Sequence, residues 1–165
     1  MALYYVSMSD LALKSMQDGS FDLDFDGKTM NLKTTDSLLN AVAVSVGSYA
    51  RNRNLKPNSA VLEPQFCGWW ADAVDPVGTL GGYIYEAFPG KLDAGTADKL
   101  KTLVKEAIEW MVEDGIAKTV ECDVNIIEDK LFGGKTAVIE VVINKPDGEY
   151  ENYNFEINWK ATNGI

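Results

Sequence analysis

Three segments near the end of the chain have the spacing of β-strands. Residues 120–126 and 153–159 alternate apolar and polar side chains, and residues 137–143 are rich in β-branched residues. A period of two is typical of a strand with one buried face. The connecting residues, 128–135 with two glycines and Lys145-Pro-Asp-Gly148, have the composition of hairpin turns. The pattern predicts a C-terminal three-stranded antiparallel meander.

The N-terminal part shows the same period on a smaller scale. Residues 21–25 alternate strictly, and residues 28–32 alternate back. Asp26-Gly27, which lies between them, is a dipeptide suited to a two-residue hairpin turn. We therefore predict an N-terminal β-hairpin.

Two segments in the middle of the chain have the spacing of helices. Apolar residues recur at helical intervals from Leu38 to about Arg51, after residues 34–36, whose side-chain oxygens are suited to cap a helix. A second helix is predicted to begin after Asp93 as its cap and to end at Gly115. Its apolar stripe comprises Leu100, Leu103, Val104, Ala107, Ile108 and Met111.

The chain between these helices is irregular. Residues 53–77 contain three prolines and no periodic pattern, which predicts a loop, and long loops in compact domains are often functional. This loop carries the apolar run Phe66-Cys-Gly-Trp-Trp70, and residues 81–88 predict one short helix.

Together these elements predict an α+β fold in one domain, residues 1–165. Its parts are an N-terminal β-hairpin (1–33), a helical middle (34–115) and the C-terminal meander (116–165). The middle holds two main helices, with the Trp-rich loop and the short helix between them.

Composition narrows the function. The net charge is −10, with 25 acidic and 15 basic residues and no basic run, which argues against nucleic acid as a partner. The chain has no histidine, and Cys67 and Cys122 form no Cys-x-x-Cys pair, which excludes the usual zinc sites and catalytic triads. We expect two reduced thiols, no cofactor and no catalytic residue. No signal peptide or membrane-spanning run is present, so we expect a soluble protein made in the cytosol with no membrane partner.

An acidic motif in the hairpin suggests a metal site. Asp22, Asp24 and Asp26, followed by Gly27, match the first half of an EF-hand calcium loop. The twelfth position of such a loop requires an acid, and here it is Lys33. We expect a solvated acidic strand face and no metal.

The irregular loop offers two further candidate sites. Glu63 and Asp72 could form the carboxylate pair of a muramidase, although acids are so frequent in this chain that the pair has little weight. Trp69-Trp70 could pin the loop to the core or form an exposed docking patch, because Trp is enriched in interface hot spots.

Several motifs taken in order resemble a known family. They are Asp10-Leu-Ala-Leu13, the Asp-rich hairpin, Gly68-Trp-Trp-Ala-Asp72, the helix with Trp110-Met-Val-Glu-Asp-Gly115, and Lys145-Pro-Asp-Gly148 before Phe155-Glu-Ile-Asn-Trp159. Nearly the whole chain resembles the small tail baseplate proteins of Mu-like phages. That family is similar to the lysozyme-like baseplate wedge proteins of T-even phages, which are not enzymes and act as sheath initiators of contractile tails.

The resemblance implies a virion structural protein of the tail baseplate. It implies contacts with baseplate wedge proteins and with the tail sheath protein, which adds strands to the C-terminal sheet at residues 153–159. Mu-like members tend to carry Arg before Gly-Trp-Trp, whereas this chain has Gln65-Phe-Cys67, so an arginine contact is not expected.

The candidate interface comprises residues from the Trp-rich loop and from the last predicted strand. We expect it to comprise Trp69, Trp70, Asp72, Tyr153, Phe155, Ile157 and Trp159. A final strand at a sheet edge without Pro or a bulge is suited to strand addition. The alternative functions are a lysozyme-like muramidase and an adaptor or inhibitor of a host protein.

Overall fold

A computed structural model describes residues 10–16, 21–35, 37–50, 68, 80–128 and 134–159. The chain forms two compact units, Met1–Ala41 and Val42–Ile165. The α+β fold with its C-terminal meander is confirmed. The assignment of all residues to one domain stays a prediction.

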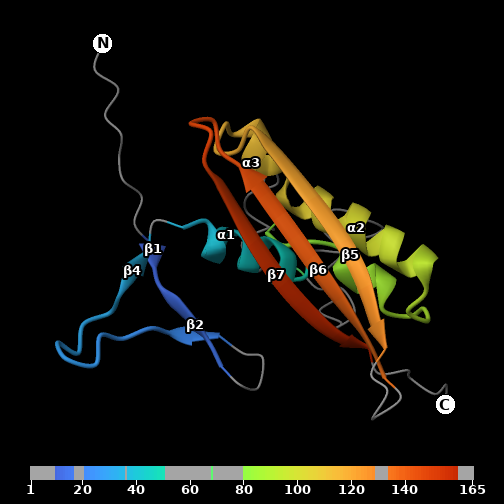
Figure 1. Cartoon of the computed structure of the whole chain (residues 1–165), viewed down its shortest axis with the longest axis horizontal. Coiled ribbons are helices and arrows are strands. Elements are labelled where there is room, and N and C mark those ends of the chain that lie inside the picture. Colours follow the sequence, from blue (N-terminus) through green and yellow to red (C-terminus); the bar gives the residue numbers. More distant parts are fainter. Residues whose placement is uncertain are drawn as a thin grey trace, which may run out of the picture. The chain divides into compact units, whose positions relative to one another are not determined.

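The first unit is built from short antiparallel strand pairs. β1 (Asp10–Leu11) pairs with β4 (Thr34–Thr35), and β2 (Leu13–Ser15) pairs with β3 (Phe21–Leu23) (Figure 1). A single bridge between Phe25 and Leu32 continues the hairpin toward its turn.

The hairpin turn is longer than the two residues that the sequence predicted. Residues 27–30 lie within it, because the backbone N–H of Asp26 donates to the carbonyl of Asn31 at 2.9 Å. The carboxylate of Asp26 accepts hydrogen bonds from the backbone N–H of Lys28 and from the hydroxyl of Thr29, each at 2.9 Å. These bonds favour an Asx-type turn, which Met30 closes at φ 57°. The two-residue prediction was therefore wrong.

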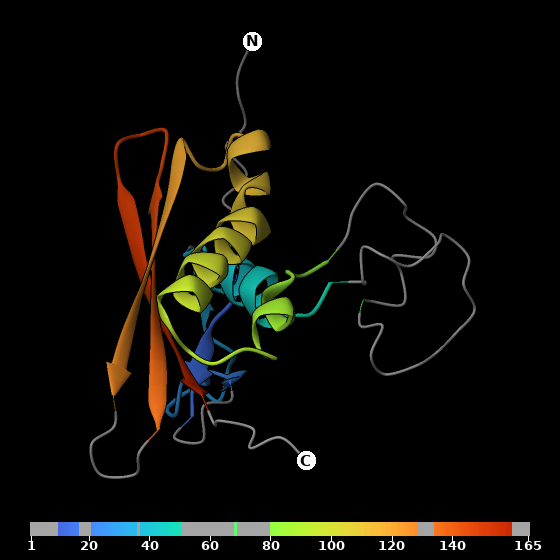
Figure 2. The same cartoon turned by 90° about the vertical axis from the view of Figure 1, so that its right-hand side faces the viewer.

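The second unit is a three-stranded sheet with helices on one face. β5 (Thr119–Glu128), β6 (Lys135–Asn144) and β7 (Tyr150–Trp159) form an antiparallel meander in that order. Figure 2 shows α2 (Ala94–Ile108) and α3 (Trp110–Glu113) on the same side of this sheet. The predicted strands are confirmed, and β7 begins three residues before Tyr153.

The predicted second helix begins after Asp93 as expected, but the structure divides it at Glu109 into α2 and α3. The side chain of Asp93 accepts a hydrogen bond from the backbone N–H of Thr96 at 2.9 Å, which also holds the pKa of Asp93 below its ordinary value. Gly115 ends the helical region at φ 73°, in the left-handed conformation that favours glycine. Among the described residues, no helix is long and apolar enough to cross a membrane.

The first helix is shorter than predicted. α1 (Leu39–Gly47) ends before Tyr49, which forms a parallel bridge with Gly82. Thr34 and Thr35 belong to β4 and do not cap this helix; the hydroxyl of Ser37 accepts from the backbone N–H of Leu39 at 3.4 Å instead. Backbone pairing after Gly47 replaces the last predicted helical turn.

Two glycines allow the chain to pass the end of α1, just before η3 (Ile84–Ala87), the short helix predicted over residues 81–88. Gly81 has φ 91°, and a Cβ there would lie 2.5 Å from the carbonyl oxygen of Ser48. A Cβ on Gly82 would lie 2.8 Å from the Cβ of Ala107 in α2. Only glycine fits at either position.

Replacing Gly82 by alanine is expected to destabilise the protein. The added methyl must displace α2 or the segment after α1, which costs about 1–3 kcal/mol in a packed core. Urea unfolding followed by circular dichroism measures the loss. Gly47→Ala is the matched control, because nothing lies within 4 Å of the added Cβ, and it should raise stability by up to about 1 kcal/mol. Equal effects from both substitutions would contradict this account of the glycines.

Candidate functional site

β7 lies at an edge of the sheet. Among the described residues it pairs with β6 alone, in an unbroken register from Tyr150–Asn144 to Trp159–Lys135. The strand contains neither proline nor a bulge, which are the devices that usually protect an edge from pairing. Within the described part of the chain, β7 is therefore an edge strand.

The hairpin turn determines which peptide groups of β7 point outward. The backbone N–H of Lys145 donates to the carbonyl of Glu149 at 2.8 Å, and Gly148 closes the turn at φ 94°. Hydrogen-bonded pairs alternate along an antiparallel ladder. The odd-numbered residues from Glu151 to Trp159 therefore bond to β6. The peptide groups of the even-numbered residues point to the open edge; these residues are Tyr150, Asn152, Asn154, Glu156 and Asn158.

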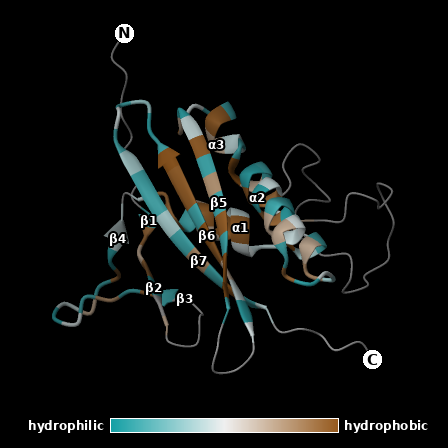
Figure 3. Cartoon of the chain, turned by 45° about the vertical axis from the view of Figure 1, so that its right-hand side comes forward, coloured by the Kyte–Doolittle hydropathy of each residue, from teal (hydrophilic) through white to brown (hydrophobic). Residues whose placement is uncertain are grey.

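Three side chains on the inner face of β7 are half-buried. Tyr153, Phe155 and Ile157 stand opposite Val141, Ile139 and Ala137 of β6, which are fully buried. The burial of the inner apolar side chains thus decreases from β6, the central strand, to β7 at the edge. Figure 3 shows the same trend, with β6 largely hydrophobic and hydrophilic positions frequent along β7.

Trp159 closes one end of this row. Its side chain is only 9% exposed, and its indole N–H donates to the carbonyl of Gly90 at 2.9 Å. Its ring packs edge-on against Phe88, with centroids 5.4 Å apart. Trp159 therefore anchors the end of β7, and its side chain belongs to the core.

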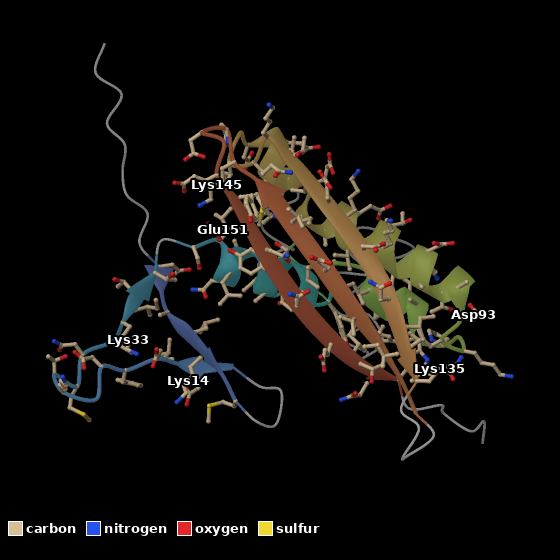
Figure 4. All side chains as sticks on the ribbon, viewed as in Figure 1. Lys14, Lys33, Asp93, Lys135, Lys145 and Glu151 are labelled. Atoms are coloured by element: carbon tan, nitrogen blue, oxygen red, sulfur yellow. The ribbon has the colours of Figure 1, made fainter. Side chains whose placement is uncertain are left out.

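A polar cluster closes the other end of the row. The ammonium of Lys145 pairs with the carboxylate of Glu151, which also accepts a hydrogen bond from the hydroxyl of Tyr153. Figure 4 places Lys145 and Glu151 at this end of the sheet and Lys135 at the opposite end. The hydrogen bond to Glu151 raises the pKa of Lys145. Glu151 and Lys145 are both half-buried, and their ion pair joins the start of β7 to the residue that follows β6.

Polar side chains predominate on the outer face of β7. The amide of Asn152 donates to Glu140 at 2.8 Å, and the hydroxyl of Thr136 donates to Asn158 at 3.0 Å. The opposite edge strand, β5, is better covered, since Val120 and Cys122 on its inner face are buried. Both β5 and β7 are edge strands among the described residues, and β7 is the one whose inner apolar side chains at 153, 155 and 157 are all half-buried.

Comparison with known proteins identifies the family. The model of the family "Phage protein GP46" matches residues 38–150, more than half of the chain. The chain belongs to the GP46 family of phage proteins. A relative, the Mu-like prophage FluMu protein gp46 of Haemophilus influenzae, is 27% identical over 152 residues, which cover 92% of this chain and 98% of the relative. The resemblance to a Mu-like phage family is thus confirmed.

In the calcium half motif, Lys33 forms an ion pair with one of the three aspartates. In this GP46-family chain the ammonium of Lys33 lies 2.7 Å from the carboxylate of Asp24, and their hydrogen bond lowers the pKa of Asp24. The described residues contain no cluster of three or more potential metal ligands. Lys33, the residue that disqualifies the sequence motif, also neutralises one of its carboxylates.

The remaining residues singled out by the sequence are those of the irregular loop and Cys122. Trp69, Trp70, Asp72, Glu63 and Cys67 lie outside the described residues. Cys122 is a buried free thiol, and burial raises its pKa to about 11. The sequence analysis missed the outward-pointing residues Asn152, Asn154 and Glu156. Their direction could have been derived by counting from the turn at Gly148.

Proposed function

We propose that this GP46-family protein is a non-enzymatic structural component of a contractile-tail baseplate. It seeds the tail sheath by accepting a strand at β7 and links the sheath to the baseplate wedge. The observation that carries the proposal is the open, unprotected edge of β7, ten residues long and in unbroken register with β6. Such an edge supplies backbone donors and acceptors that a partner strand can satisfy.

The family membership supports a role in a phage particle. Sheath initiation is the more specific role that the resemblance to baseplate proteins implies. The acidic net charge of −10 favours a protein partner over nucleic acid. A muramidase or a host-protein adaptor has no specific support among the described residues. We propose that the protein acts in the virion, at the tail baseplate.

Sheath seeding is the direct test. Substoichiometric amounts of the purified protein are added to the purified sheath protein of the same phage, and polymers are counted by negative-stain electron microscopy. We expect the protein to shorten the lag before sheath polymers form and to lie at one end of each polymer. Polymerisation that is unaffected by the protein at any ratio would refute the proposed function.

A further inference from the structure

The inner row of β7 is a short apolar window with closed ends. Tyr153, Phe155 and Ile157 are half-buried, the ion pair of Glu151 with Lys145 lies at one end, and buried Trp159 lies at the other. An added strand would place its own side chains beside this row, because directly opposite residues on neighbouring strands have Cβ atoms about 4.5–5.5 Å apart. Only three alternate positions of that strand would meet apolar side chains.

The outer row of β7 has the opposite chemistry. Asn152, Asn154, Glu156 and Asn158 are exposed. Within the described part of the chain Glu156 has no ion-pair partner, and its neighbour across the ladder on β6 is Val138. An opposite charge directly across an antiparallel or parallel pair is stabilising, whereas a like charge is destabilising. A cation of the partner is therefore favoured opposite Glu156.

We propose that the strand bound by β7 has a defined pattern, an inference that rests on the strand addition proposed above. It carries three apolar residues at alternate positions and polar residues between them, with Lys or Arg opposite Glu156. A shift by one residue would turn its apolar side chains to the Asn-rich face. A shift by two toward the start of β7 would place one of them beside Glu151 and Lys145, and a shift by two toward its end would place one beside the buried Trp159. The window therefore sets both the sequence and the register of the partner strand.

Short fluorescent peptides test the pattern on the full chain. The first probe alternates valine and lysine, Val-Lys-Val-Lys-Val between serines. The second has the same composition with the three valines adjacent, and the third has glutamate in place of lysine. Affinities are measured by fluorescence anisotropy at low ionic strength. We expect the alternating lysine peptide to bind at least about tenfold more tightly than either of the others, as the loss of matched apolar and charged pairs implies.

A charge swap makes the test specific. Glu156→Lys lies on the exposed face and should reverse the preference between the lysine and glutamate peptides without changing the stability of the protein. Equal binding of all three peptides, or an unchanged preference in Glu156→Lys, would overturn the pattern.

A variant with a blocked edge separates the two proposals. Asn154→Pro removes an outward N–H and keeps Glu156. If Asn154→Pro abolishes the binding of all peptides, strand addition at β7 is supported, even where the peptides do not show the proposed side-chain pattern. If peptides that bind the wild type bind Asn154→Pro equally well, or if no peptide binds the wild type and sheath seeding is also absent, strand addition itself fails.

Discussion

Asn154→Pro is expected to abolish sheath seeding while the protein stays folded. The backbone N–H of Asn154 points to the open edge, as the parity set by the Lys145–Glu149 hydrogen bond requires. Proline removes this donor and places its ring where a partner strand must approach. At an edge whose N–H faces solvent, proline is tolerated within a strand. Seeding is measured by electron microscopy and folding by circular dichroism and urea unfolding.

Two further substitutions are controls for Asn154→Pro. One tests the loss of the Asn154 side chain alone, and the other tests the loss of a hydrogen bond within the sheet. Asn154→Ala keeps the N–H and should seed as the wild type does. Ile157→Pro removes an N–H that bonds to β6 and the half-buried Ile157 side chain, so it should destabilise the protein by several kcal/mol, about 3 or more for proline inside an ordered element. Normal seeding by Asn154→Pro would show that the sheath does not pair with this edge. Unfolding of Asn154→Pro with a stable Ile157→Pro would show that the parity is reversed.

Local patterns were sufficient for most of the second unit. The period of two predicted β5, β6 and β7, and Asp93 and Gly115 marked the ends of the long helical region. In these segments, local propensity and burial favour the same structure, so the pattern is unambiguous. The edge position of β7 was expected from the resemblance and from the lack of proline, and β7 is an edge strand within the described part of the chain.

The errors lie where particular hydrogen bonds, and not the apolar period, decide the structure. α1 ends early because Tyr49 pairs with Gly82, and no local pattern links these residues. The turn after Asp26 is long because the Asp26 carboxylate binds the turn itself, which competes with a tight two-residue turn. The alternation of 153–159 marked Trp159 as one more interface aromatic, whereas its indole N–H binds Gly90, 69 residues away.

Trp159→Ala is expected to produce a large loss of stability. Truncation removes a buried indole that packs on Phe88 and leaves the carbonyl of Gly90 without its donor. Large-to-small substitution of a buried Trp costs about 3–5 kcal/mol, which is a large fraction of the stability of a typical domain. The free energy of unfolding is measured by urea titration followed through circular dichroism, because the other tryptophans complicate fluorescence.

Two substitutions make this result specific to the anchor. Trp159→Phe keeps a ring against Phe88 but loses the N–H, so it should cost less than alanine does, with about 1 kcal/mol from the hydrogen bond itself. Tyr150→Ala, at the opposite end of β7 and 70% exposed, should change stability by no more than about 0.5 kcal/mol. If Trp159→Ala were as mild as Tyr150→Ala, the strand would not be anchored at Gly90. In that case Trp159 would be available to a partner, and the docking window would extend to the end of β7.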